Sequence, residues 1–201
     1  MADAVLQGVL LGLLLSILIG PVFFALIETS IHKGFKAALI MNAGVLLSDI
    51  ICLSIAYWGA YSLIRDMADQ RLFYIIGGSV FIIFGLVKLL KKQPQLQPVI
   101  INANTALRLF LKGMLLNGIN PSVILFWLGT VALASSKYPL DSRLVFIFFL
   151  FTIATVIITD ISKIYLAGKL KRFMSEGFLS KVNLVTGAVF CLFGLIMIIN
   201  S

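Results

Sequence analysis

The chain has 201 residues, of which 61% are hydrophobic and only 12% carry a charge. Soluble domains carry roughly 25% charged residues, so this composition excludes a water-soluble globular fold and predicts an integral membrane protein. A formal net charge of +8 would suggest nucleic acid as a partner for a soluble protein. Here the basic residues lie mainly in the connections on one side of the predicted membrane spans, as is typical of membrane proteins, and no nucleic-acid partner is expected.

Six apolar segments follow one another along the chain, each close to the ~20 residues that cross the hydrocarbon core of a bilayer. They are predicted at residues 4–27, 37–64, 72–90, 109–134, 144–166 and 182–199. The first lacks the basic start and the small-residue cleavage site of a signal peptide, and it continues beyond Gly20. We therefore expect it to remain as the first span of an all-α integral membrane protein with six transmembrane helices.

Prolines interrupt the first and the fourth segment, at Gly20-Pro21 and at Asn120-Pro121. A proline inside a helix removes a backbone N–H group and clashes with the preceding turn. Lipid cannot satisfy the backbone groups that such a break frees, so protein or a water-lined cavity must surround it. Broken helices at corresponding positions of two halves indicate the binding site of a transporter.

The two halves of the chain are similar in other ways. Residues 78–86 read GSVFIIFGL and residues 187–195 read GAVFCLFGL, and each half has one aspartate in its second span, Asp49 or Asp160. Because each half has an odd number of spans, the second copy must be inverted relative to the first. We predict a single transmembrane domain over residues 1–201, with one repeat at 1–90, a polar linker at 91–108 and a second repeat at 109–201.

Lysine and arginine are divided unevenly between the two predicted sides of the membrane. The connections after spans one, three and five hold eleven of them and the opposite side holds four, with Lys163 counted as intramembrane. Since the side richer in basic residues faces the cytoplasm, both termini are predicted to be extracytoplasmic. This orientation requires that all six segments cross the membrane.

Asp49, Asp160 and Lys163 lie well inside the apolar segments. A charge at mid-span costs at least ~2.5–3.5 kcal/mol on insertion scales, so each is a candidate functional residue. Asn42 precedes Asp49 by seven residues and shares its helical face, and Thr155 belongs to a polar stripe that Asp160 borders. Asp160 and Lys163 are close enough to pair on one helix. The alternative reading is a self-neutralised pair near the cytoplasmic end, with Lys163 reaching outward to water.

Each proline break also offers polar backbone. A helix that resumes after Pro21 or Pro121 would present free N–H groups and a positive dipole end to a carboxylate. Carbonyl groups before the break could accept from an ammonium group, and Asn117 and Asn120 add amide donors and acceptors. An amino-acid zwitterion needs both kinds of partner at once. The sequence holds no catalytic or phosphate-binding motif and no metal-ligand spacing, so no enzyme activity, metal or cofactor is expected.

The segments around both breaks resemble the lysine exporter (LysE/RhtB) family. The resemblance is carried by Gly20-Pro21, KGFKAA at residues 33–38, Gly44, Ser48-Asp49, and FLKGMLLNGINP at residues 110–121, which is similar to the family signature F-x-x-G-x-x-x-N-x-x-N-P. It covers essentially the whole chain. It implies a multi-pass exporter of amino acids or close derivatives in the bacterial inner membrane, surrounded by lipid and driven by the proton gradient.

By this resemblance the pathway for substrate and protons would be lined or shaped by Gly20, Pro21, Asp49, Asn117, Asn120 and Pro121. The first break departs from the family pattern, because Val22 stands where asparagine is usual. Phe23 and Phe24 follow it, so the pocket is expected to favour an apolar or modified substrate.

Two other functions remain open on the sequence alone. A transmembrane thiol-electron carrier needs two reactive cysteines near the breaks, whereas Cys52 and Cys191 occupy non-equivalent positions away from both prolines. A non-transporting membrane scaffold or assembly partner would not need intramembrane aspartates. A homo-oligomer is compatible with the sequence, which does not define the oligomeric state.

Overall fold

The computed structural model describes residues 1–18, 20–66, 71–90, 105–169 and 176–199. In these ranges the named elements are all helices: α1 (Ala2–Ile17), α2 (Pro21–Lys33), α3 (Phe35–Asp66), α4 (Arg71–Leu90), α5 (Ala106–Gly118), α6 (Pro121–Lys137), α7 (Arg143–Tyr165) and α9 (Glu176–Ile199). The all-α fold class predicted from the sequence is therefore correct. Residues 91–104, which make up most of the predicted linker, lie outside the described residues.

Two of the predicted apolar segments are each divided into a pair of helices. α1 ends at Ile17 and α2 begins at Pro21, with a bend of 73° between them. α5 ends at Gly118 and α6 begins at Pro121, and this pair is bent by 62°. In both pairs the proline is the first residue of the second helix. The N–H group of a residue at this position makes no hydrogen bond within the helix, so a proline there breaks none.

Among the described residues, two continuous helices are long and apolar enough to cross a membrane: Phe35–Ala60 within α3, and Arg143–Tyr165, which is α7. Each bent pair adds a crossing if its two helices belong to one span. The described residues of α9 give only a shorter apolar stretch, Gly187–Ile196. The chain thus has the helices of a membrane protein, and the number of six spans stays a prediction.

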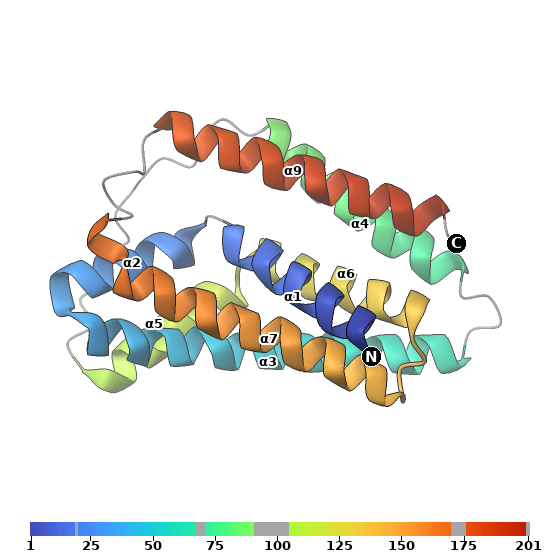
Figure 1. Cartoon of the computed structure of the whole chain (residues 1–201), viewed down its shortest axis with the longest axis horizontal. Coiled ribbons are helices and arrows are strands. Elements are labelled where there is room, and N and C mark those ends of the chain that lie inside the picture. The colour runs from blue at the N-terminus through green and yellow to red at the C-terminus, as the bar shows by residue number, and fades with distance from the viewer. Residues whose placement is uncertain (19, 67–70, 91–104, 170–175, 200–201) are drawn as a thin grey trace.

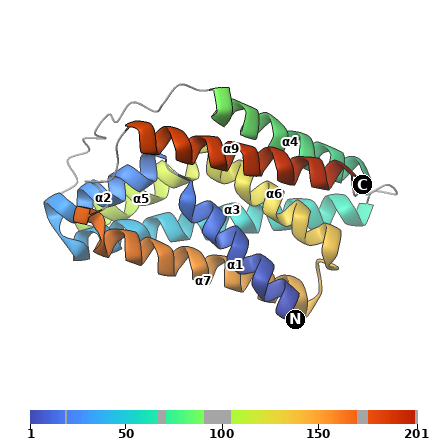
Figure 2. The ribbon, with the colours of Figure 1, turned by 45° about the horizontal axis from the view of Figure 1, so that its top comes forward.

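The helices form a bundle with a separate pair along one side (Figures 1 and 2). The separate pair consists of α4 and α9, which pack along each other. Within the bundle, α1 packs along α7 and α3 packs along α5. The pair contacts the bundle chiefly through α6, where the ring of Phe81 fits over Gly129. Aromatic side chains fill the interior, among them Phe126, Trp127 and Phe148.

Glycines allow the close approach of the packed helices. A Cβ atom on Gly78 would lie 2.6 Å from the carbonyl oxygen of Gly194, and one on Gly85 would lie 2.6 Å from that of Gly187. These four glycines are the repeated positions of the GSVFIIFGL and GAVFCLFGL segments. Small residues at such positions let helix backbones touch in a membrane, where apolar burial alone does not hold helices together.

The same kind of contact joins each broken pair to a helix of the other half. A Cβ atom on Gly12 of α1 would lie 2.6 Å from the carbonyl oxygen of Thr152 on α7, and Gly113 of α5 is packed against the carbonyl of Met41 on α3. Thr152 precedes Asp160 by eight residues, and Met41 precedes Asp49 by the same number. The two halves therefore contact each other at corresponding positions of their sequences.

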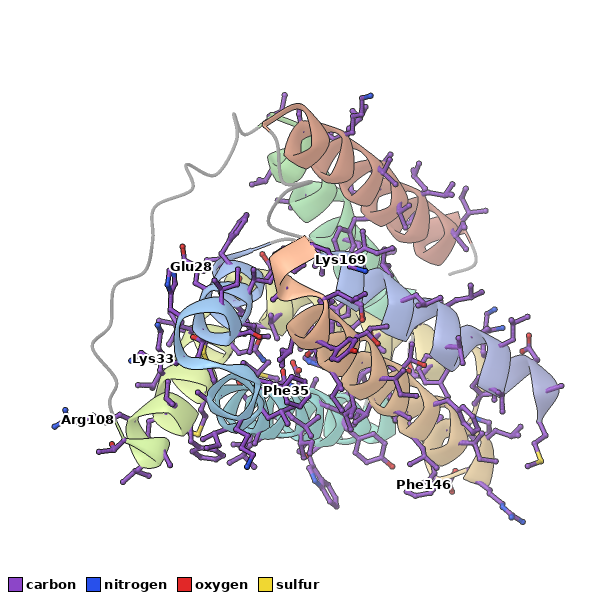
Figure 3. The ribbon with its side chains drawn as sticks, turned by 60° about the vertical axis from the view of Figure 1, so that its left-hand side comes forward. Glu28, Lys33, Phe35, Arg108, Phe146 and Lys169 are labelled. Atoms are coloured by element: carbon purple, nitrogen blue, oxygen red, sulfur yellow. The ribbon has the colours of Figure 1, made fainter. Side chains whose placement is uncertain are left out.

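Basic residues gather at one end of the bundle. Figure 3 places Lys33, Arg108 and Lys169 there, whereas the first turn of α1 and the last turn of α9 lie at the opposite end (Figure 1). At that opposite end the Tyr138 hydroxyl donates to Asp3 Oδ2 at 2.6 Å. Burial, aided by this bond, raises the pKa of Tyr138 to about 12, so the hydroxyl stays a donor at physiological pH. Which end faces the cytoplasm stays a prediction.

Candidate functional site

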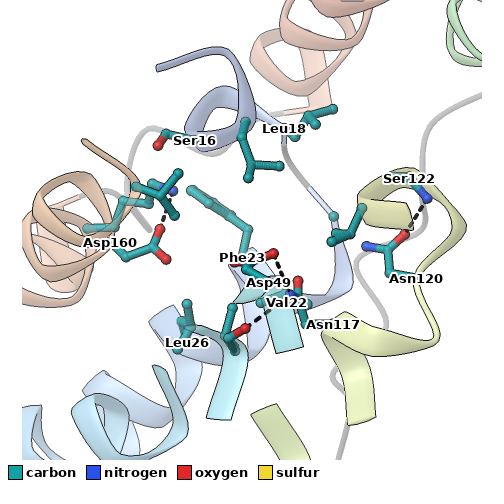
Figure 4. A pocket seen from close by; sticks show the side chains of 16 residues that line it. Ser16, Leu18, Val22, Phe23, Leu26, Asp49, Asn117, Asn120, Ser122 and Asp160 are labelled. Atoms are coloured by element: carbon teal, nitrogen blue, oxygen red, sulfur yellow. Dashed lines mark hydrogen bonds and ion pairs between the residues drawn. The ribbon is translucent and has the colours of Figure 1, made fainter. Parts of the chain in front are cut away.

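A cavity of about 60 Å³ lies where the two bent helix pairs meet α3 and α7 (Figure 4). Its lining residues are Leu15, Ser16, Leu18, Gly20, Val22, Phe23, Leu26, Val45, Asp49, Asn117, Asn120, Ser122, Val123, Val156, Asp160 and Lys163. They come from both halves of the chain and include both intramembrane aspartates. A buried water needs ~10–15 Å³, so the cavity has room for roughly four or five water molecules.

Asp49 on α3 is held by two donors from the other half of the chain. Asn117 Nδ2 on α5 and Trp127 Nε1 on α6 each donate to Asp49 Oδ1 at 2.9 Å. The Asp49 residue is only 3% exposed, and a buried carboxylate needs such partners because it has lost its water. Both donors use the same oxygen. Among the described contacts, Oδ2 is therefore the atom that can take a proton or a cation.

Asp160 on α7 has a cation as its partner. The Lys163 Nζ atom lies 2.7 Å from Asp160 Oδ1, and it also lies 5.8 Å from the centre of the Phe23 ring on α2. Figure 4 shows Asp160 and Phe23 at this side of the cavity. The pairing of Asp160 with Lys163 was predicted from their spacing. The alternative reading also required this ion pair, and it differs from the structure only in its second part, because Lys163 lines the cavity and does not reach outward.

Hydroxyl groups tie α1 to α7 beside Asp160. The Ser16 and Thr159 hydroxyls lie within hydrogen-bond distance of each other, and one of them donates to the other. The hydroxyl that does not donate there can donate to a carbonyl of its own helix, that of Gly12 at 2.7 Å from Ser16 or that of Thr155 at 2.8 Å from Thr159. Thr155 donates to the Phe151 carbonyl at 2.7 Å and its side chain packs against Gly12. It lies in the α1–α7 contact and is not among the cavity residues.

The two helices that follow the breaks begin differently. The Asn120 Oδ1 atom accepts from the backbone N–H of Ser122 at 3.0 Å and so caps α6. Gly20 is the N-cap of α2 and provides no side-chain hydrogen bond. A helix N-terminus without a side-chain cap keeps free N–H groups that attract a negative charge. The start of α2, where Gly20, Val22 and Phe23 line the cavity, is therefore the more positive of the two ends.

Five of the nine residues predicted for the pathway line this cavity: Gly20, Asp49, Asn117, Asn120 and Asp160. The other four do not. Pro21 is exposed at the start of α2, Pro121 begins α6, and Thr155 packs in a helix contact. Asn42 is buried in α3, and its Oδ1 atom has no hydrogen-bond partner among the described residues.

Sequence reasoning missed Ser16 and Trp127, whereas Phe23 lines the cavity as the sequence suggested. Ser16 stands five residues before Pro21, so distance from the break could have suggested it. Trp127 is buried, and a buried indole N–H group needs an acceptor. Its position six residues after Pro121, on the same helix, was the available signal.

The described residues also bear on metal and thiol chemistry. No group of three or more potential metal ligands occurs among them. Cys52 and Cys191 are free thiols on α3 and α9. Cys191 packs against α4, with its sulfur 3.8 Å from the Ile82 carbonyl oxygen. Nothing in these positions favours the thiol-electron carrier.

The fold and the site indicate an integral membrane protein of the transporter class, with a small cavity between two bent helix pairs that both aspartates line. The LysE type translocator family matches residues 13–201, and the chain belongs to this family. The resemblance found in the sequence is thus confirmed. The chain is also 24% identical over 192 residues to the "Putative amino acid efflux protein YcgF" of Bacillus subtilis (strain 168), with 94% of this chain and 92% of that protein covered. No solved structure matches the chain.

Proposed function

We propose that the protein exports amino acids or close derivatives across the bacterial inner membrane and that the cavity around Asp49 and Asp160 binds the substrate. Membership of the translocator family and the name of the Bacillus subtilis relative support the transport class. The observation that carries the proposal is the cavity itself, because both broken helices and both intramembrane carboxylates meet in it. Such groups are too costly in a membrane to be kept without a use.

The two halves would act as inverted repeats. Cavity residues occur at corresponding positions of the halves: Asp49 with Asp160, Val45 with Val156 four residues before each, and Gly20 with Asn120 before each proline. The glycine contacts between α4 and α9 support the same relation, since Gly78 meets Gly194 as Gly187 meets Gly85. Inverted repeats that share a central site can open it alternately to either side of the membrane.

An amino-acid zwitterion fits the charges around the cavity. Its ammonium group would approach the carboxylates, which are strong partners for a cationic donor. Its carboxylate would face the start of α2, where no side-chain cap is present. Val22 and Phe23 border the same space and leave it without a polar side chain at that position. An apolar or modified amino acid therefore suits the site better than one with a charged side chain.

Proton coupling would use the same carboxylates. A substrate ammonium and a proton both neutralise a carboxylate, so they compete for it. If a proton takes the place of the substrate after its release, inward proton flow drives export. The cavity of about 60 Å³ is far below the ~300–1,000 Å³ of sites for larger ligands. A substrate larger than a few water molecules therefore needs a wider cavity than the one in this structure.

The test is efflux of preloaded, labelled amino acids from cells that produce the protein, with and without a proton-gradient uncoupler. The wild type should export at least one amino acid, and the uncoupler should stop it. Asp49→Asn and Asp160→Asn should each lower the initial rate at least about tenfold. Asp141→Asn, which changes an exposed carboxylate between α6 and α7, is the matched control and should leave the rate unchanged.

Absence of efflux for every amino acid tested would contradict the proposal. Full efflux by both aspartate variants would contradict the role of the cavity. A cellular phenotype that depends on the protein but not on either aspartate would favour the scaffold alternative instead.

A further inference from the structure

The ammonium group of Lys163 lies in a site that would suit the amine of a substrate. It is 2.7 Å from Asp160 Oδ1 and 5.8 Å from the centre of the Phe23 ring, and all three residues line the cavity. A carboxylate beside an aromatic face is the combination that binds organic ammonium ions, because the ring face is electronegative. The chain therefore fills an amine site with its own side chain.

We propose that Lys163 is a tethered ammonium ion that competes with the amine of the substrate for Asp160. An amine can bind Asp160 only after Lys163 has moved away, so Lys163 lowers the apparent affinity of the site for amines. This inference rests on the proposed role of the cavity as the substrate site. It adds Lys163 as a residue that determines the affinity for the substrate. It also adds a step to binding, since Lys163 must be displaced before the substrate binds tightly.

The ion pair of Lys163 with Asp160 adds little support to the fold, and Lys163 contacts another helix through the Phe23 ring on α2. Lys163 and Asp160 lie on the same helix, three residues apart, so their pairing joins no two elements of the bundle. Pairs at this spacing contribute little to a helix, and a buried ion pair is weak evidence of stabilisation. The two side chains are 17% and 10% exposed. Lys163 is two residues from the end of α7, where a lysine stem is long enough to reach water instead.

The two carboxylates differ in a way that favours displacement at Asp160. Asp49 is held by neutral donors on Asn117 and Trp127, which belong to packed helices and are buried. Asp160 is paired with a long side chain that can rotate away without moving a helix. The position that corresponds to Lys163 in the first half, three residues after Asp49, is Cys52. Only the Asp160 side thus has a cation of its own among the cavity residues.

Exchange of one ammonium for another also keeps the charge of the site constant. When the substrate amine replaces Lys163, Asp160 goes from one cationic partner to another and is not left alone in a low-dielectric space. A single unpaired buried charge is strongly destabilising. The exchange therefore keeps Asp160 paired throughout, while competition with Lys163 makes the apparent affinity lower than that of an empty carboxylate site.

The experiment measures binding of simple amines to the purified full chain in detergent. The probe for Lys163→Ala is n-propylammonium, which reproduces the missing three carbons and the charge, and the readout is the increase of Tm with probe concentration. We expect a saturable increase for Lys163→Ala and a half-saturating concentration at least tenfold higher for the wild type. The double variant Asp160→Asn, Lys163→Ala should not respond, and neither should Lys163→Ala with uncharged 1-propanol.

Lys163→Met provides a second test in case the alanine variant does not fold. It keeps most of the stem and removes only the charge, so methylammonium is the matching probe and should raise its Tm but not that of the wild type. Equal responses of wild type and variants, or no response of a folded variant, would overturn the proposal. The assay does not involve transport. A negative result here leaves amino-acid export standing, and failed export with positive binding rejects only the proposed function.

Discussion

Trp127 and Asp49 connect the two halves of the chain in the centre of the bundle, where the indole Nε1 atom donates to the carboxylate Oδ1 atom at 2.9 Å. Trp127 is fully buried, so this bond is not exposed to competing water. Together with the bond from Asn117 it fixes the carboxylate at the cavity wall. Asp160 faces the same cavity and is paired with Lys163 of its own helix. The site thus combines one carboxylate held by neutral donors and one paired with a cation.

Trp127→Phe should impair export while it preserves most of the packing. The change removes one of two donors from a buried carboxylate, and a hydrogen bond to a charged group contributes ~1.5–3 kcal/mol. We expect the initial efflux rate to fall at least about tenfold. Trp58→Phe is the matched control, because Trp58 is 67% exposed, and it should retain the wild-type rate. Equal rates for both variants would show that the indole donor is dispensable.

Gly194→Ala should destabilise the protein through the contact between α4 and α9. The added methyl group would meet the Gly78 carbonyl and the Ile82 backbone, and overpacking of this kind costs ~1–3 kcal/mol. Gly59→Ala makes the same change on α3, where a Cβ atom meets nothing within 4 Å. It should be neutral or stabilising by up to ~1 kcal/mol. Thermal unfolding in detergent compares the two, and similar Tm values would argue against close packing at Gly194.

Asn120→Ala should lower stability because it removes the side-chain cap of α6. Loss of an N-cap typically costs ~0.5–2 kcal/mol. Asn120→Ser keeps an oxygen that can accept from the Ser122 N–H group and should recover most of the loss in the same unfolding assay. If serine is as harmful as alanine, the effect of Asn120 comes from its cavity contacts and not from the cap.

The predicted orientation can be checked by cysteine labelling. Lys36→Cys places an exposed thiol in the first turn of α3, and Asp141→Cys places one between α6 and α7 at the opposite end of the bundle (Figure 1). Both changes are made in a chain whose Cys52 and Cys191 are replaced by serine. A membrane-impermeant maleimide should label position 141 in intact cells and position 36 only after the cells are opened, because the basic side faces the cytoplasm. The reverse pattern would place both termini in the cytoplasm.

Much of the candidate site could be predicted because polar groups are costly in a membrane. That cost marks Asp49, Asp160 and the two proline breaks in any sequence reading. The position of Thr155 could not be predicted in this way. Its place in a polar stripe suggested the pathway, but the rotation of α7 against α1 turns it toward Gly12. Trp127 was overlooked for the opposite reason, since its apolar ring conceals the single N–H group that matters.

By itself the sequence determined the class of the protein, the apolar segments, the breaks and the few charged residues inside them. All of these follow from local chemistry, because a missing N–H group or a buried charge has its cost wherever the helix lies. Only the tertiary structure decided which partner each charge has. Asp49 receives neutral donors from α5 and α6, and Asp160 receives Lys163 from its own helix. Partnership depends on how helices distant in sequence are rotated and packed, which no local pattern contains.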